Sequence, residues 1–122
     1  MKVYLAGPMR GIPDFNFPAF HAAAARLRQA GFIVFSPAER DEALYGTELL
    51  KTATGSEAGA TDKGFSIRDA LGADTAWICA ESEGCVLLPG WEDSRGAVAE
   101  KYLHDALGLP TIFYAHLPWR RA

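Results

Sequence analysis

The sequence predicts an α/β domain in which helices cover a parallel sheet. Short β-rich runs alternate with segments of helical periodicity, which is the order of strand–helix–strand units. The chain of 122 residues is 49% apolar and 22% charged, a composition that can build one core. We therefore expect a single domain over residues 1–122, with ligands bound at the carboxyl ends of its strands.

The first third of the chain is predicted to form a strand, a helix and a second strand. Lys2–Ala6 is a short apolar run that ends at a glycine and a proline, which indicates a buried strand. Residues 16–30 carry apolar side chains at three- and four-residue steps before a glycine, which predicts a helix. Residues 32–35 are β-rich, so they predict a second strand parallel to the first.

The periodic pattern is lost over residues 38–64, which are rich in glycine, serine and threonine. Only residues 42–51 look locally helical. Loops beyond about 12–15 residues in a compact domain are usually functional or disordered. We interpret residues 38–64 as either a lid over a ligand or a loop without fixed structure.

The second half repeats the alternation. Ser66 can cap a helix, and residues 84–88 predict a third strand. A last helix begins at Asp93 or Ser94, and residues 110–114 predict a fourth strand. The helix after Ser66 has one broad side formed by Ile67, Leu71, Asp74 and Ile78. The apolar stripe expected on the last helix consists of Ala99, Tyr102, Leu103 and Ala106.

Composition excludes several classes of function. The net charge of −3 argues against binding to a nucleic acid polymer, which needs a basic footprint. No apolar run approaches the roughly 20 residues of a membrane span, and the first residues do not resemble a signal peptide. Cys79 and Cys85 complete no Cys/His cluster, so no metal is expected. We interpret both as reduced core residues of a cytoplasmic protein.

Two segments that follow strands could bind an anion. Arg10 stands between Gly7 and Gly11, where the backbone can approach a phosphate and the guanidinium can pair with it. The alternative is a tight turn with a solvated arginine, and the dinucleotide fingerprint is absent. Ser94 opens the last helix, where free amides favour an anion, although it could serve only as a cap. Gly96 is unexpected there, because an interior glycine costs about 1 kcal/mol, and close approach of a ligand would explain it.

Carboxylates supply the remaining candidates. Asp74 shares a helical side with apolar residues and can point inward, whereas Asp69 is expected to face water. Glu100 lies less than two turns into the last helix, and a solvated glutamate is the alternative. Two carboxylates around one ligand suit glycosidic chemistry. Two aromatic residues, Phe15 and Trp91, could stack on a base. Of the two histidines considered, His21 is expected at the surface and His104 is expected to pair with Glu100.

These residues resemble a known family. The run from Tyr4 to Gly11 (YLAGPMRG), the later LLPGW that ends at Trp91, and Ser94-x-Gly96 followed by Glu100 are similar to motifs of the nucleoside 2-deoxyribosyltransferase superfamily. The most similar members form a small branch that carries the Leu-Pro-Gly-Trp sequence and is related to 2′-deoxynucleoside 5′-monophosphate N-glycosidases. The resemblance extends over residues 3–114.

The resemblance implies a Rossmann-like, flavodoxin-like three-layer fold with four or five parallel strands, usually in a homo-oligomer (a dimer or tetramer). It implies cleavage of N-glycosidic bonds without a cofactor. Glu100 would attack the anomeric carbon, Asp74 would assist the departing base, with Asp69 as the rival acid, and Tyr4 would hold Glu100. The substrate-binding residues would be Gly7, Arg10, Gly11, Phe15, Asp69, Gly90, Trp91, Ser94 and Gly96.

Ser94 bears on the choice of substrate. In the family's nucleotide hydrolases a serine six positions before the nucleophile contacts the 5′-phosphate, whereas nucleoside transferases have an aspartate there. An aspartate would repel a phosphate dianion, so Ser94 favours a nucleoside 5′-monophosphate. Pro8 replaces a hydroxyl residue of the nucleotide hydrolases and removes one phosphate contact. We also consider a non-catalytic nucleotide sensor and a flavin-binding electron carrier.

Overall fold

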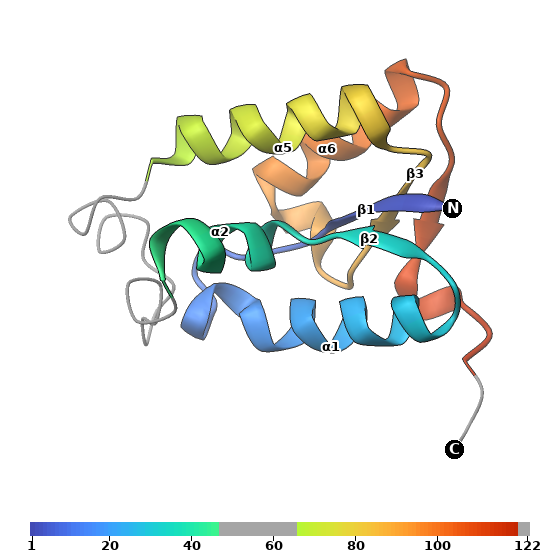
Figure 1. Ribbon diagram of the computed structural model, residues 1–122, viewed down its shortest axis with the longest axis horizontal. Coiled ribbons are helices and arrows are strands. Elements are labelled where there is room, and N and C mark those ends of the chain that lie inside the picture. The colour runs from blue at the N-terminus through green and yellow to red at the C-terminus, as the bar shows by residue number, and fades with distance from the viewer. Residues whose placement is uncertain (47–65, 120–122) are drawn as a thin grey trace.

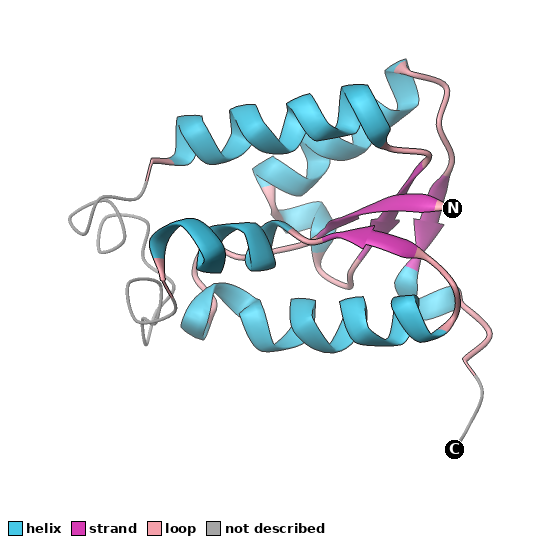
Figure 2. Cartoon of the chain, in the orientation of Figure 1, coloured by secondary structure: helices cyan, strands magenta, loops and turns pink. Residues whose placement is uncertain are grey.

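A parallel sheet of four strands forms the centre of the computed structural model, which describes residues 1–46 and 66–119. The strands are β1 (Lys2–Ala6), β2 (Ile33–Phe35), β3 (Gly84–Leu87) and β4 (Thr111–Phe113), in the order β2-β1-β3-β4. All pairings are parallel. The α/β class and the three-layer arrangement predicted from the sequence are therefore confirmed (Figure 2).

Helices cover both faces of this sheet. One face is covered by α1 (Phe17–Gln29), and the other by α5 (Ile67–Glu81) and α6 (Arg95–Ala106) (Figure 1). The fourth helix of the described residues, α2 (Pro37–Tyr45), contacts both α1 and α5. Short 3₁₀ turns occupy Pro13–Asn16, Trp91–Asp93 and Tyr114–His116.

Successive side chains of β1 point to opposite faces of the sheet and belong to two separate parts of the core. Val3 and Leu5 face α1 and pack against side chains such as Phe20. Tyr4 and Ala6 face the opposite side, where they pack with residues of α5 and α6. The strand β1 pairs with both β2 and β3, and helices cover both faces of the sheet, so its side chains from Val3 to Ala6 are buried.

The chain after β2 differs from the prediction. Residues 38–64 were expected to form one long connection with a helix at 42–51, but α2 begins at Pro37. Proline is favoured in the first helical turn, and Ala38 is fully buried against the α1 side of the core. Apolar periodicity did not predict this helix because many of its residues are polar. The rest of the predicted lid, residues 47–64, lies outside the described residues.

The predicted apolar stripe of α6 is wrong for three of its four residues. Ala99, Tyr102 and Ala106 are exposed, with Tyr102 at 65%, whereas Leu103 is partly buried against the core and the buried face carries Ala97, Glu100 and His104. Both polar side chains are hydrogen-bonded beneath the helix, which makes their burial possible. Periodicity of apolar residues did not predict this face because two of its three buried residues, Glu100 and His104, are polar.

Other expectations were partly met. Leu71 is 37% exposed, because it lies at the cavity described below, whereas Asp74 and Ile78 are buried on α5 as predicted. Cys85 is buried but Cys79 is exposed, so only one of the two cysteines belongs to the core. Over residues 1–46 and 66–119, no helix has the length and apolar character to cross a membrane.

Candidate active site

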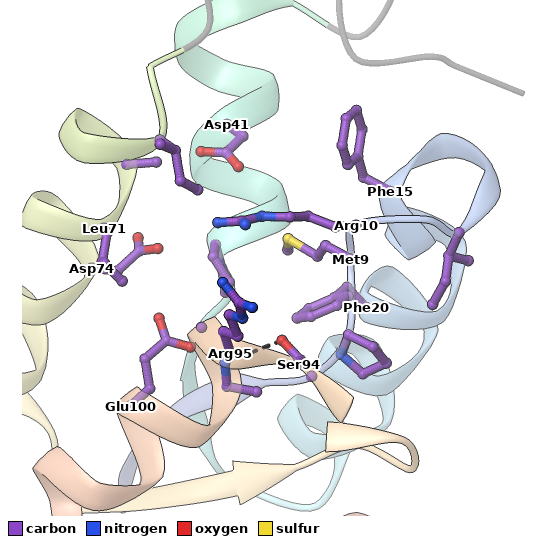
Figure 3. A pocket seen from close by; sticks show the side chains of 18 of the residues that line it. Met9, Arg10, Phe15, Phe20, Asp41, Leu71, Asp74, Ser94, Arg95 and Glu100 are labelled. Carbon is purple, nitrogen blue, oxygen red and sulfur yellow. Dashed lines mark hydrogen bonds between the residues drawn. The ribbon is translucent and has the colours of Figure 1, made fainter. Parts of the chain in front are cut away.

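A cavity of about 520 Å³ opens at the carboxyl ends of the strands (Figure 3). Its walls come from the segments that follow β1, β2 and β3, together with the start of α5. This is the position expected for a ligand in a parallel sheet. Among the described residues after β4, none from Ala115 to Trp119 lines the cavity.

Most of the predicted site residues line this cavity. They are Tyr4, Gly7, Arg10, Phe15, Asp74, Gly90, Ser94, Gly96 and Glu100. Three of the predicted residues do not. Asp69 is exposed on α5, Gly11 is exposed in the loop after β1, and Trp91 packs against Phe113 with ring centroids 6.3 Å apart. The structure therefore favours Asp74 over Asp69 as the second carboxylate.

Glu100 lies at the floor of the cavity and is 7% exposed. Tyr4 Oη donates a hydrogen bond of 2.5 Å to Glu100 Oε2. The Tyr4 ring is fully buried and stacks on Phe35 with centroids 5.6 Å apart, and Phe35 stacks on Trp77 of α5. Since aromatic packing fixes the phenol, the carboxylate of Glu100 is held in one orientation.

Asp74 faces the same cavity from α5 and is 6% exposed. Its Oδ1 atom has no hydrogen-bond partner among the described residues. Figure 3 shows the carboxylates of Asp74 and Glu100 on neighbouring helices at one side of the cavity. An unpartnered buried oxygen is costly, so a ligand that donates a hydrogen bond would be favoured there.

Burial dominates the electrostatics of this pair. Desolvation raises the pKa of Glu100 to about 8, although the hydrogen bond from Tyr4 opposes the shift. Desolvation likewise raises the pKa of Asp74 to about 7, and the charge of Asp41 adds to it. The pKa of Tyr4 lies well above its ordinary value because the phenol is buried beside both acids. Near neutral pH the pair can therefore share a proton.

His104 supports the helix beneath Glu100 and does not contact its carboxylate. Its Nδ1 donates to the Glu100 carbonyl oxygen at 2.7 Å, and its Nε2 lies 2.7 Å from Ser82 Oγ. The expected pairing of the two residues therefore occurs through the backbone. Burial lowers the pKa of His104, so a neutral ring is favoured. His21 is half-exposed and contacts Glu42 of α2.

The start of α6 forms another wall. Ser94 is its N-cap, because Ser94 Oγ accepts a hydrogen bond from the Ala97 amide at 3.2 Å. Gly96 lines the cavity in the first turn, and a Cβ built there would meet no described atom within 4 Å. Packing of the described residues therefore gives no reason for a glycine at this position. Gly7 differs, since its Cβ would come within 2.8 Å of Leu88.

The loop after β1 reaches the cavity through unusual backbone conformations. Asp14, Phe15 and Asn16 have φ values of 54°, 52° and 62°, in the left-handed region that residues other than glycine rarely adopt. Asn16 Nδ2 donates to the Pro8 carbonyl oxygen at 3.0 Å and braces the loop. Phe15 is thereby directed to the cavity (Figure 3). Strain of this kind clusters at ligand-binding loops.

Three charged residues of the cavity had no role in the sequence-based site: Asp41, Asp93 and Arg95. Asp41 of α2 is 5% exposed, and Arg95 lies beside Ser94 at the start of α6. Asp41 falls in a segment that follows a predicted strand, which was the signal that could have identified it. Arg95 follows the N-cap, a position that is ordinarily solvated. Among the described residues, no group of three His, Cys, Asp or Glu side chains is arranged to hold a metal ion.

Comparisons with known proteins place the chain in a family. The family model described as "Domain of unknown function (DUF4406)" matches residues 1–113, so the chain belongs to that family. A search of curated proteins gives no match.

Proposed function

We propose that the protein cleaves the N-glycosidic bond of a (deoxy)nucleoside or of its 5′-monophosphate through a glycosyl-enzyme intermediate on Glu100. The observation that carries the proposal is the hydrogen bond of 2.5 Å from Tyr4 Oη to Glu100 Oε2, on the floor of a cavity that also contains Asp74. The resemblance to the nucleoside 2-deoxyribosyltransferase superfamily supports it independently.

In the first step, an oxygen of ionised Glu100 bonds to the anomeric carbon of the sugar. The bond from that carbon to the base nitrogen breaks, and its electron pair stays with the base. Asp74 donates its proton to the departing base, which leaves neutral. The positive charge that develops on the sugar is stabilised by the nearby carboxylates in a site shielded from water.

This step requires one proton on the pair formed by Asp74 and Glu100. Since burial raises the pKa of Asp74 to about 7 and that of Glu100 to about 8, one proton can remain on the pair near neutral pH. The phenol of Tyr4 supplies the only hydrogen bond to the Glu100 side chain among the described residues, and it lowers the pKa of both acids. Because the pKa of Glu100 is the higher of the two, the shared proton lies more often on Glu100 in the free protein, and the reactive form is the fraction in which Glu100 is ionised and Asp74 holds the proton.

In the second step, water or a second base attacks the anomeric carbon and releases Glu100. Asp74, now ionised, accepts the proton of the attacking group. Attack by water gives the free sugar or sugar phosphate, and attack by a base gives a new nucleoside. Both outcomes return the two carboxyl groups to their initial protonation states.

Ser94, Arg10 and the start of α6 support a 5′-monophosphate as the substrate. Ser94 and Gly7 face the cavity from two loops, and helix amides near Ser94 favour an anion. Arg10 lines the same cavity and can neutralise a phosphate dianion. A nucleoside without the phosphate would forgo these interactions.

Base release is the direct test. Each deoxynucleoside and its monophosphate is incubated with the protein, and free base is measured by chromatography. Glu100→Gln should lower the rate by at least about 1000-fold, while exposed Glu81→Gln, far from the cavity, serves as the control. Mass spectrometry should detect the sugar on Glu100 in wild type. Tight binding of a nucleotide without release across the whole panel would favour the sensor, and a yellow protein would favour the flavin carrier.

An oligomer is the second part of the proposal. The exposed side of α6 carries Ala99, Tyr102 and Ala106, an apolar face directed away from the sheet. We propose that this face contacts a second copy of the chain. Sedimentation should show a dimer or tetramer in wild type and a smaller species in Tyr102→Arg. A wild-type monomer would contradict it.

A further inference from the structure

The proposed reaction uses Glu100 and Asp74 but leaves a third buried carboxylate in the same cavity. Asp41 is 5% exposed and lines the cavity from α2, on the wall opposite α5. Its charge raises the pKa of both Asp74 and Glu100, so the three groups lie close enough to interact. A protein gains no stability from a third buried acid beside two others, which points to a ligand.

The hydrogen bonds of Asp41 leave room for a ligand. Arg40 Nη1 donates to Asp41 Oδ1 at 3.1 Å, which fixes the carboxylate, and the described residues give its Oδ2 atom no partner. Across the cavity, Asp74 Oδ1 is buried and has no partner within the same part of the chain. Figure 3 shows both carboxylates directed into the space between α2 and α5. The ionised carboxylate of Asp41 only accepts hydrogen bonds, so a group that binds beside its Oδ2 atom must donate one.

The order of groups along the cavity identifies which part of the substrate reaches Asp41. In Figure 3, Asp41 lies at one end of the cavity and Ser94 and Glu100 lie toward the other, with Asp74 between Glu100 and Asp41 and the Arg10 side chain between Asp41 and Ser94. Phe15 also lies toward the Asp41 end and supplies an aromatic surface. A phosphate at Ser94 and an anomeric carbon at Glu100 would place the base near Phe15 and Asp41.

We propose that Asp41 accepts a hydrogen bond from an exocyclic amino group of the base, so that the substrate carries an amino-bearing base and not uracil or hypoxanthine. This inference rests on the proposed function, because it uses the sugar position that Glu100 implies. The keto oxygen of uracil would face the carboxylate oxygen without a shared proton, and the two acceptors would repel.

Matched pairs of nucleotides test the proposal on the wild-type protein. dCMP and dUMP differ in an amino against a keto group at one ring position, and dGMP and dIMP differ by the 2-amino group alone. We expect kcat/KM for base release to be about 10- to 100-fold higher for the amino-bearing member of at least one pair. Dissociation constants from calorimetry should show the same order without any turnover.

Variants assign the effect to Asp41. Asp41→Asn should reduce the preference within that pair by at least about 10-fold, because the amide nitrogen now faces the amino group. Asp105→Asn, which removes an exposed carboxylate of α6, should keep the wild-type preference. Thermal unfolding checks that both variants fold, and the wild-type comparison stands even if Asp41→Asn does not.

The outcomes separate this inference from the proposed function. Selective binding of dCMP or dGMP without base release would support the role of Asp41 and overturn the glycosidase. Release of base at equal rates within both pairs, with equal affinities, would overturn the role of Asp41 and keep the glycosidase. An unchanged preference in a folded Asp41→Asn variant would also overturn it. Binding of none of the four nucleotides would overturn the role of Asp41, whereas the proposed function is decided by base release across the whole panel of deoxynucleosides and monophosphates.

Discussion

Tyr4 and Glu100 are 96 positions apart in the sequence and are joined by a hydrogen bond of 2.5 Å in the interior. Tyr4 belongs to the central strand, and Glu100 belongs to the helix that follows β3. The contact turns a polar side of α6 toward the sheet and places the carboxylate at the cavity. The feature that gives α6 an unexpected core face is therefore also the feature on which the proposed chemistry depends.

Tyr4→Phe should lower kcat for base release by about 10- to 100-fold while preserving the stack on Phe35. Because the phenol lowers the pKa of Glu100, its loss should raise that pKa and move the acidic limb of the pH–rate profile to higher pH. Kinetics from pH 5 to 9 measure both effects. Tyr114→Phe, at a tyrosine outside the cavity lining, is the control. An unmoved acidic limb would remove Tyr4 from the mechanism.

The buried acids should make the protein less stable as the pH rises. The pKa of Glu100 rises from 4.5 to about 8 on folding, so between these values the folded protein holds a proton that the unfolded chain has lost. Stability therefore falls with pH across this window. We expect the Tm to drop from pH 5 to pH 8.5, and Glu100→Gln to raise the Tm at pH 8.5 by about 5 °C or more. Calorimetry that shows no gain in this variant would contradict the buried, proton-retaining carboxyl.

Ser94→Asp separates the two roles of this residue. Aspartate is also a good N-cap, so the start of α6 should be preserved, but its charge should repel a phosphate. We expect kcat/KM for monophosphates to fall by about 100-fold or more, with a much smaller change for nucleosides. Ser94→Ala should instead lose about 1 kcal/mol of stability with the cap. Equal losses on both substrate classes in Ser94→Asp would show that this position does not meet the phosphate.

Gly96→Ala should stabilise the fold and lower the catalytic activity. No described atom lies within 4 Å of the added Cβ, and alanine is favoured over glycine in a helix by up to about 1 kcal/mol. If substrate occupies this space, kcat/KM should nevertheless fall by about 10-fold or more, since a methyl group would meet the ligand. Gly7→Ala is the contrasting variant, because its Cβ would lie 2.8 Å from Leu88 and should destabilise the fold. A stabilised Gly96→Ala with full activity would exclude close approach of substrate.

Local signals predicted the elements well where apolar residues mark the core. The strands predicted at residues 2–6, 32–35, 84–88 and 110–114 differ from β1, β2, β3 and β4 by at most one residue at either end. Ser66 and Ser94 cap their helices as expected. The prediction failed where polar residues form the packed face. In α2, a helix with a buried Ala38 was taken for a connection, and in α6 the stripe through Tyr102 was placed inside. Both helices pack polar side chains that need partners from distant segments.

The amino-acid sequence determined the class of fold and the edge of the sheet at which a ligand can bind. It could do so because apolar runs, caps and glycines act over a few neighbouring residues. The sequence also favoured an inward Asp74 and a solvated Asp69, which the structure confirms. Only the tertiary structure decided that Trp91 turns away from the cavity and that Asp41 joins the two other acids. These outcomes depend on which side chains from separate elements meet, and burial beside one another then sets their proton affinities.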